Sequence, residues 1–422
     1  MPLPDLIEIV PPPPPAYVSI TVPGSKSITN RALILAALSS GTVTLTGALW
    51  SEDTQVMTEC LRQMGFAVGV APDYAEEANR VIQVEGQGGR IPKAGTESSP
   101  LELHVGNAGT AARFLAAMVC LGEGSYRLSG VPRMHERPQA ALLKALRSLG
   151  YRVDAPGDRL PAVIHGTGPR RASCQVSVAD SSQFASALLL SGKVAGWKVG
   201  VSDANPDELP YVEMTRLLIE SFPHSGGEFQ IEPDASSGSY FWGASRLLGK
   251  NRVDVARWPG SGWQVDARYP DFLDLPSEVS RERDLGDSIM TAIALAPLED
   301  HPVRFTELGR LRLQECERVQ ALRTELTKCG ASVAESGDCL LIRPSILHGA
   351  EIETYDDHRM AMCFGMLGLR IPGMRLRNPR CVRKTFPNFF RKLAGTPPFG
   401  LGAIILDVAT GRVLPLNELN AE

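Results

Sequence analysis

No run of 18 consecutive apolar residues occurs in this sequence, so we expect no transmembrane helix. Basic residues are not in excess, because 43 Lys and Arg stand against 47 Asp and Glu, and this balance argues against a dedicated nucleic-acid binder. The N-terminal stretch has no basic segment before an apolar one, so we expect neither a secretory signal nor a transit peptide. The eight cysteines form no CxxC pair, which argues against a zinc or redox centre. These absences favour a cytoplasmic protein with no nucleic-acid or membrane partner.

The composition of the 422 residues is that of a folded protein with a large core, since 43% are hydrophobic and 21% are charged. The chain has 40 glycines and 32 prolines, more than average, which predicts many short elements joined by tight turns. The length predicts two or three domains.

A repeated pattern runs through the chain. A cluster of small or acidic residues precedes an apolar helix, a glycine follows, and then a run that alternates like a β-strand. The pattern begins near residues 23, 106, 180, 234, 284 and 355. Helix-ending glycines are expected at Gly41, Gly122, Gly192 and Gly249. Five of the six units add a second, amphipathic helix, and the third and fourth units are shorter than the others.

Six helix N-termini of this kind would attract anions, because each offers free N–H groups and a partial positive charge, although capping alone explains such residues at any one helix. Cations accompany these helix starts at Lys26, Arg31, Arg137, Arg318, Arg359 and Lys384. Asp287 and Glu315 are candidate acid and base groups, with helix capping and an ion pair as the alternative interpretations. The residues predict a site for two anionic substrates with proton transfer and without a metal ion.

Nine segments together resemble one enzyme family. They are PGSKSITNRALILAAL, GNAGTAARF, PRMHERP, SSQF, PYVEMT, DASSGSYF, QECERV, YDDHRMAMCF and KTFPNFF, in this order over residues 20–393. They resemble the EPSP synthases, the 3-phosphoshikimate 1-carboxyvinyltransferases. The resemblance implies an α/β fold: a two-domain inverse α/β barrel of six βαβαββ-like repeats, the third and fourth shortened here, with the active site in the interdomain cleft. The first domain would comprise residues 1–22 and 235–395, the second residues 23–234, and residues 396–422 would form a C-terminal extension.

The resemblance also implies a reaction in the shikimate pathway of aromatic amino acid biosynthesis. The enolpyruvyl group of phosphoenolpyruvate would move to the 5-hydroxyl of shikimate 3-phosphate, with release of phosphate, by addition and elimination. No cofactor and no metal ion are expected, and a monomer is expected. Glyphosate would compete at the phosphoenolpyruvate site.

The implied site residues fall into three overlapping groups. The catalytic residues would be Lys26, Asp287, Glu315 and Lys384. Shikimate 3-phosphate would be bound by Lys26, Ser27, Arg31, Ser181, Ser182, Gln183, Tyr211, Asp287 and Gln314. Phosphoenolpyruvate would be bound by Lys26, Asn107, Gly109, Arg137, Gln183, Arg318, Arg359 and Lys384. Asp287 would take the proton of the 5-hydroxyl, and Glu315 would protonate the methylene carbon.

The sequence departs from the family pattern at four positions. Gln314 stands where a lysine is usual, and Arg310, in place of an asparagine, would restore part of the lost charge. Glu208 stands where a phosphate-binding serine is common, and its carboxylate would repel the 3-phosphate unless it turns away. Phe114 replaces a proline, which leaves glyphosate binding open. Two alternatives therefore remain, namely enolpyruvyl transfer to a different acceptor and a non-catalytic paralogue that binds shikimate 3-phosphate.

Beyond the resemblance, residues 396–422 predict a hairpin around Thr410-Gly411 on a sheet edge.

Overall fold

The structure is a computed structural model that describes residues 3–14, 17–203, 208–249 and 252–421. The chain divides into two compact units. We call Gly24–Glu232 the inserted unit, and Met1–Pro23 together with Pro233–Glu422 the flanking unit. The chain therefore leaves the flanking unit once, builds the inserted unit, and returns.

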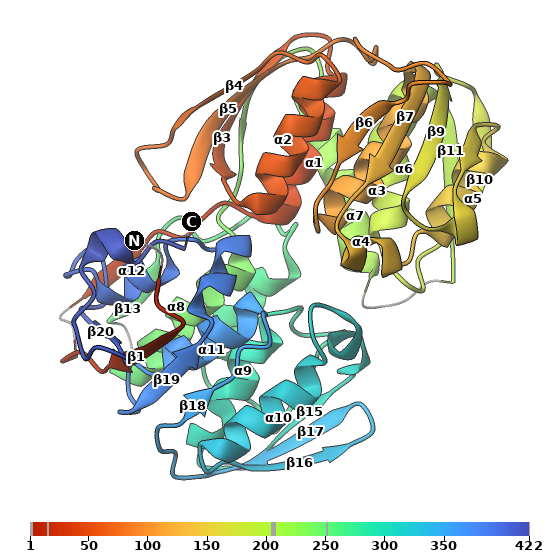
Figure 1. Ribbon diagram of the computed structural model, residues 1–422. Coiled ribbons are helices and arrows are strands. Elements are labelled where there is room, and N and C mark those ends of the chain that lie inside the picture. Colours follow the sequence, from red (N-terminus) through yellow and green to blue (C-terminus); the bar gives the residue numbers. More distant parts are fainter. Residues whose placement is uncertain (1–2, 15–16, 204–207, 250–251, 422) are drawn as a thin grey trace. The chain divides into compact units, whose positions relative to one another are not determined.

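The described part of the inserted unit combines helices with short strands (Figure 1). Its helices are α1 (Lys26–Leu38), α2 (Glu52–Gln63), α3 (Gly109–Met118), α4 (Pro132–Glu136), α5 (Ala140–Ser148), α6 (Gln183–Ala195) and α7 (Leu209–Ser221). Its strands are β3 (Thr42–Leu49), β4 (Val68–Pro72), β5 (Asn79–Glu85), β6 (Leu101–His104), β7 (Glu123–Ser129), β8 (Arg152–Asp154), β9 (Ala162–Thr167), β10 (Ala172–Ser177), β11 (Trp197–Ser202) and β12 (Gly227–Gln230).

These strands form three sheets, in the orders β12-β3-β5-β4, β6-β7-β9-β8 and β10-β11. Each sheet contains one parallel pair, namely β12–β3, β6–β7 or β10–β11. The apolar helices α1, α3 and α6 pack on one another, and every residue of α3 is buried. Helix α5 is amphipathic and turns Leu142, Leu143 and Leu146 inward. The predicted distinction between apolar inner helices and amphipathic outer helices is therefore present in the packing.

The flanking unit follows the same plan (Figure 1). Its described helices are α8 (Ala235–Leu248), α9 (Ile289–Leu295), α10 (Arg318–Lys328), α11 (His358–Leu367) and α12 (Phe389–Ala394). Its strands are β1 (Leu6–Val10), β2 (Val18–Ile20), β13 (Val253–Val255), β14 (Glu278–Ser280), β15 (Val303–Thr306), β16 (Ser332–Ser336), β17 (Cys339–Arg343), β18 (Glu351–Ile352), β19 (Met374–Arg377) and β20 (Ile404–Asp407).

Three sheets form here too, in the orders β18-β19-β1-β20, β14-β15-β17-β16 and β13-β2. Helices α8, α9 and α11 pack on one another in the core of this unit. The C-terminal residues belong to the unit, because β20 pairs antiparallel with β1 at the sheet edge. A bridge between Leu406 and Val413 closes the hairpin around Thr410-Gly411, as predicted.

The two passages between the units exchange strand partners. Strand β2 leads along the chain into α1 and β3, but it pairs with β13. Strand β12 leads into α8 and β13, but it pairs with β3. Helix α1 therefore lies in a repeat with β12, which comes from the C-terminal end of the inserted unit. Helix α8 lies in a repeat with β2, from which the inserted unit separates it along the chain.

The fold agrees with the predicted α/β repeats. The six apolar helices are α1, α3, α6, α8, α9 and α11, and the third and fourth repeats are short because their sheets have two strands instead of four. The helix end predicted at Gly192 was wrong, since α6 continues to Ala195 and ends at Gly196, whose φ of 74° is the left-handed conformation that glycine favours. Among the described helices, none is long and apolar enough to cross a membrane.

Candidate active site

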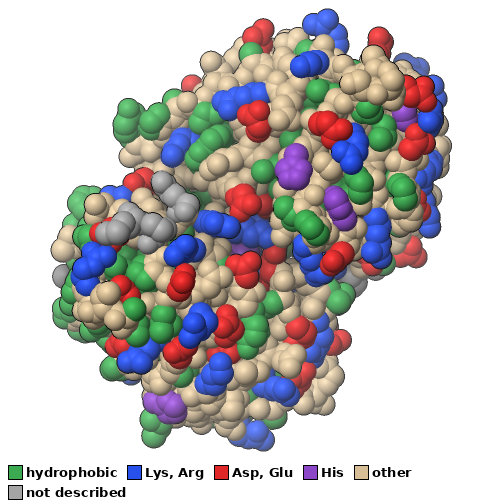
Figure 2. Space-filling model, viewed as in Figure 1, with side chains coloured by type: hydrophobic (Ala, Val, Ile, Leu, Met, Phe, Trp, Pro, Cys, Tyr) green, Lys and Arg blue, Asp and Glu red, His purple; other side chains and the backbone are tan. Residues whose placement is uncertain are grey.

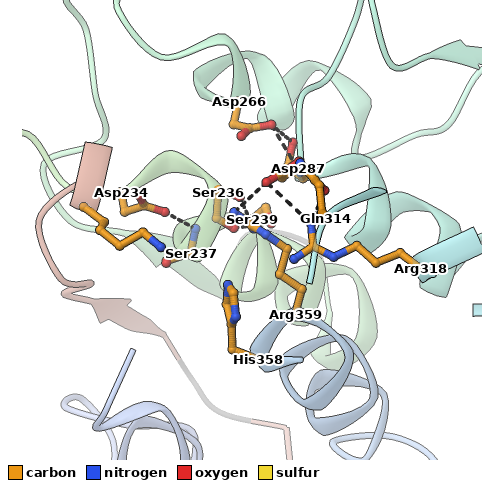
Figure 3. A network of polar contacts seen from close by, with 12 residues as sticks. Asp234, Ser236, Ser237, Ser239, Asp266, Asp287, Gln314, Arg318, His358 and Arg359 are labelled. Carbon is orange, nitrogen blue, oxygen red and sulfur yellow. Dashed lines mark hydrogen bonds and ion pairs between the residues drawn. The ribbon is translucent and has the colours of Figure 1, made fainter. Parts of the chain in front are cut away.

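The carboxylate of Asp287 lies among three guanidinium groups of the flanking unit, those of Arg281, Arg318 and Arg359, and Figure 3 labels the last two. Arg359 Nη2 is 3.0 Å from its Oδ2, Arg318 Nη1 is 3.8 Å from Oδ2, and Arg281 Nη2 is 3.1 Å from Oδ1. Burial alone would raise the pKa of Asp287, but the charges of Arg359, Arg318 and Arg281 outweigh burial and hold this pKa well below its ordinary value. Asp287 is therefore ionised, and the positive charge around it exceeds its own.

A second carboxylate, that of Asp357, positions two of these arginines. Asp357 is the N-cap of α11, and its Oδ1 accepts the backbone N–H of Arg359 at 2.9 Å. Its two oxygens also accept from Arg318 Nε at 2.7 Å and Nη2 at 3.2 Å, while both side chains are at most 2% exposed. Such a two-point pair fixes the plane of a guanidinium. The remaining face of Arg318 is thereby directed toward Asp287.

The side-chain amide of Gln314 connects Asp287 to Arg318. Its Nε2 donates to Asp287 Oδ1 at 3.3 Å, and its Oε1 accepts from Arg318 Nη1. A lysine at this position would have no acceptor to offer Arg318. Gln314 therefore joins the group of arginines and carboxylates rather than adding a cation to it.

Lys384 and Glu315 form an ion pair of 2.6 Å in the same unit. Lys384 ends a 3₁₀ helix, Pro379–Lys384, and Glu315 follows another, Gly309–Leu313. Their side chains are 17% and 27% exposed, so both are accessible to a small molecule. A bound anion would compete with Glu315 for the ammonium group.

The backbone beside Asp287 is held by Asp266. Ser288 donates to Asp266 Oδ1 from both its N–H, at 3.0 Å, and its hydroxyl, at 2.5 Å. Burial, together with the nearby charge of Asp287, raises the pKa of Asp266. On the other side, Arg359 Nη1 donates to the hydroxyl of Ser236 in α8 (Figure 3). Asp287 and Arg359 are thus held from several elements of the unit.

In the inserted unit, Arg31 is a buried cation whose hydrogen bonds go to neutral oxygens. Its side chain donates to Thr215 Oγ1 at 2.8 Å, to Ser186 Oγ at 3.1 Å and to the carbonyl of Ser27 at 2.9 Å. Burial lowers the pKa of Arg31 to about 10. The guanidinium also lies over the ring of Phe114 at 5.3 Å, an arrangement that stabilises a cation.

Gly109 begins α3 at a point where two more guanidinium groups converge. A Cβ atom at this position would lie 2.4 Å from Arg113 Nη1 and 2.7 Å from Arg137 Nη2. Arg113 donates to Gln183 Oε1 at 3.1 Å, and Arg137 donates to the carbonyl of Asn107 at 3.2 Å. The side-chain Oδ1 of Asn107 is buried and has no hydrogen-bond partner among the described residues. The absence of a side chain at Gly109 therefore makes room for a concentrated positive charge.

Lys26, the first residue of α1, forms an ion pair with Asp53 at 3.3 Å. Lys26 is partly exposed, and so is Ser27 beside it. The ammonium group is therefore accessible to an anion, although Asp53 already holds it.

The backbone at the start of α6 binds a carboxylate group that belongs to the protein itself. Ser182 N–H donates to Glu208 Oε2 at 2.5 Å, and Gln183 N–H donates to Ser181 Oγ at 3.2 Å. Ser181, Ser182 and Glu208 are all less than 9% exposed. Glu208 is the N-cap of α7, and the carbonyl of Tyr211 in the first turn of that helix accepts from Arg31 at 3.5 Å. Helices α1, α6 and α7 thus meet at this anion-binding point.

These residues supply cations and hydrogen-bond donors rather than a set of metal ligands. In the ranges that the structure describes, the one close group of ligand-type atoms is Glu299, Asp300 and His301. Arg246 donates to Glu299 at 2.6 Å, and His301 lies 2.8 Å from Asp300. No candidate residue belongs to this group.

Comparison with known proteins identifies the family of the chain. The family model described as EPSP synthase (3-phosphoshikimate 1-carboxyvinyltransferase) matches residues 13–271 and 277–393. A 3-phosphoshikimate 1-carboxyvinyltransferase of Opitutus terrae is 38% identical over 93% of this chain and 98% of its own length, and one of Trichormus variabilis is 35% identical over 90% and 96%. The chain belongs to the EPSP synthase family.

Solved structures agree with this fold. An EPSP synthase from Acinetobacter baumannii has a TM-score of 0.73 at 22% identity, with 95% of this chain and all of that chain covered. The enolpyruvyl transferase NikO from Streptomyces tendae has a TM-score of 0.67 at 17% identity, with 97% and 99% covered. The family match includes every candidate residue from Lys26 to Lys384 and ends before the C-terminal hairpin.

Within this EPSP synthase family member, the residues predicted from the sequence fall into two groups, one per unit. Asp287, Gln314, Glu315, Arg318, Arg359 and Lys384 belong to the flanking unit. Lys26, Ser27, Arg31, Asn107, Gly109, Arg137, Ser181, Ser182, Gln183 and Tyr211 belong to the inserted unit. In the flanking unit, Asp287 contacts Gln314, Arg318 and Arg359, and Glu315 contacts Lys384.

The sequence analysis missed two arginines. Arg113 lies within the apolar helix α3, four residues after Gly109, and a charge in so apolar a helix was a usable signal. Arg281 lies in the charged segment SRERD, where nothing distinguishes it from its neighbours. Arg281 supplies positive charge beside Asp287, the charge that a lysine at the position of Gln314 would have brought.

Side chains of both signs are interspersed on the face of each unit that Figure 2 shows. This distribution agrees with the formal net charge of -4. On this face, Lys and Arg therefore do not form one broad basic surface.

Proposed function

We propose that the protein transfers the enolpyruvyl group of phosphoenolpyruvate to the 5-hydroxyl of shikimate 3-phosphate, with release of phosphate. The observation that carries this proposal is the Asp287 carboxylate surrounded by Arg281, Arg318 and Arg359. Both substrates are polyanions, and one reaction step needs a base. The guanidinium groups would bind the anionic substrates, and the carboxylate among them would be the base.

The inserted unit would bind most of the acceptor. Arg31 suits the carboxylate of shikimate 3-phosphate, because it is buried and its described hydrogen bonds go to neutral oxygens. Ser27 would assist it. Ser181 and Ser182 at the start of α6 would bind the 3-phosphate, with Gln183 and Tyr211 beside the ring.

The remaining cations would bind phosphoenolpyruvate. This set consists of Arg318, Arg359 and Lys384 of the flanking unit together with Lys26 and Arg137 of the inserted unit. Asn107, Gly109 and Gln183 would complete it from the inserted unit. Arg113 would act as a positioning residue, because it donates to Gln183 and contacts the space above Gly109.

The chemistry would proceed by addition and elimination. Asp287 accepts the proton of the 5-hydroxyl while the oxygen of that hydroxyl bonds to C2 of phosphoenolpyruvate. Glu315 delivers a proton to C3. The tetrahedral intermediate then loses a proton from C3 and the phosphate from C2, which restores the double bond. Lys384 would bind the phosphate that leaves and would also orient Glu315. No cofactor is needed, because every proton has a side chain that can hold it.

Binding of phosphoenolpyruvate would also increase the basicity of Asp287. Its low pKa results from Arg359, Arg318 and Arg281. An anion bound to Arg318 and Arg359 neutralises part of that charge, so the proton affinity of Asp287 rises when the substrate is present. The base would thereby become effective only with the enolpyruvyl donor in place.

The test is phosphate release with both substrates and with each substrate omitted in turn. We expect release only when both are present, and we expect Glu315→Gln to abolish it. Glu351→Gln is the matched control, since Glu351 is an exposed glutamate of the flanking unit paired with Arg377. Release without shikimate 3-phosphate, or full activity in Glu315→Gln, would contradict the proposal. Because all assigned residues lie on one chain, we expect activity from the monomer.

A further inference from the structure

The starting observation is that Glu208 already occupies the anion-binding position at the start of α6. Its carboxylate accepts the N–H of Ser182 at 2.5 Å, and the next N–H, that of Gln183, is bonded to Ser181 Oγ at 3.2 Å. Glu208 comes from a different helix, α7, and only 6% of it is exposed. A carboxylate at this place is thus part of the folded structure, not a side chain turned to solvent.

Several groups hold Glu208 there. The N–H of Ser182 carries the partial positive charge of a helix start, which favours an anion. The guanidinium of Arg31, a residue of α1, attracts the carboxylate of Glu208 electrostatically. These groups are the ones that the proposed function assigns to the acceptor.

The acceptor's phosphate and Glu208 need the same donor. A phosphate monoester carries a charge of about −1.5 to −2 near neutral pH. One N–H cannot make a short, straight hydrogen bond to two anions, and two anions in a buried place repel each other strongly. Binding of the phosphate therefore requires Glu208 to give up its bond to Ser182.

We propose that Glu208 is an internal competitor for the phosphate of the acceptor and thereby sets acceptor specificity. By occupying Ser182, it weakens binding of a phosphorylated acceptor and leaves binding of the unphosphorylated one unaffected. The protein therefore discriminates less between shikimate 3-phosphate and shikimate than it would with a neutral residue at position 208. This inference rests on the proposed function, because that function places the 3-phosphate at Ser181 and Ser182.

The test is Glu208→Gln, which keeps the shape of the side chain and removes its charge. We expect the KM for shikimate 3-phosphate to fall at least about tenfold, the equivalent of ~1.4 kcal/mol. The KM for shikimate and the KM for phosphoenolpyruvate should stay the same. Glu220→Gln is the matched control, because Glu220 is an exposed glutamate near the other end of α7.

Calorimetric titration of shikimate 3-phosphate separates this inference from the proposed function. Tighter binding to Glu208→Gln supports the competition even if no variant turns over, in which case the transferase proposal alone fails. An unchanged or weaker affinity overturns the competition, as does an equal gain for shikimate. Absence of binding to the wild type and to Glu208→Gln alike overturns both. Glu208→Ser is the second variant, should the glutamine variant not fold.

Discussion

Replacing Gly109 by alanine should impair the binding of phosphoenolpyruvate, because the new methyl group enters the space between two arginines. The Cβ atom would lie 2.4 Å from Arg113 Nη1 and 2.7 Å from Arg137 Nη2. To reach an ordinary contact of 3.4 Å, Arg113 must retreat by about 1.0 Å (3.4 − 2.4) and Arg137 by about 0.7 Å (3.4 − 2.7). Arg113 is 2% exposed and bonded to Gln183, so its retreat breaks that bond.

A misplacement of about 1 Å in a positioning group can lower kcat/KM by about 10²-fold. We therefore expect Gly109→Ala to reduce kcat/KM for phosphoenolpyruvate by about 10- to 100-fold and to change the KM for shikimate 3-phosphate by a smaller factor, through the lost bond to Gln183. The assay is initial-rate phosphate release with one substrate varied at saturating levels of the other. Gly260→Ala is the control, since nothing lies within 4 Å of a Cβ built at Gly260. An unchanged KM for phosphoenolpyruvate in a folded Gly109→Ala protein would refute the reasoning.

Three further predictions concern stability and the acceptor side. Asp287→Asn should abolish turnover and should destabilise the fold at neutral pH. Because the pKa of Asp287 is depressed in the folded protein, the stabilising effect of its carboxylate is present above pH ~4 and is lost at lower pH. Urea titrations of the wild type and of Asp287→Asn should therefore converge in acid. Asp357→Asn should lower the free energy of unfolding by about 3–5 kcal/mol, since it removes the nearer of the two carboxylates that pair with the buried Arg318; a loss under 1 kcal/mol would contradict this. Phe114→Leu should raise the KM for the acceptor about fivefold, or ~1 kcal/mol, because Arg31 loses the ring beneath it, and an unchanged KM would count against this role.

The repeats were predictable from the sequence because each apolar helix has its own local pattern. The segments that begin α1, α3 and α6 combine small or polar starts with continuous apolar runs. Helix ends were less certain. Gly192 follows Ser191 and Gly196 follows Ala195, and neither neighbour shows which of the two glycines takes the left-handed conformation that ends the helix at Gly196.

The site was only partly predictable, because contacts between distant residues leave no local pattern. Arg281 and Asp287 are six residues apart without a helix to bring them together, and their ion pair depends on the folded loop. The sequence indicated that Glu208 would repel a phosphate unless it turned away. Its bond to Ser182, 26 residues distant, depends on how α7 packs on α6. Resemblance to a family supplied the candidate binding residues by position but could not supply this contact.

The place of β1 in its sheet has a consequence for synthesis on the ribosome. Strand β1 (Leu6–Val10) pairs with β19 and β20, whose residues are made more than 360 positions later. At about 5–20 residues per second, this strand waits roughly 20–75 s for its partners while the inserted unit is completed. Glu8 places a charge in the middle of its five residues, and prolines follow it directly at Pro11–Pro14. Both features discourage pairing with strands of other molecules. Strand β1 can therefore remain unpaired until the rest of the flanking unit is synthesised.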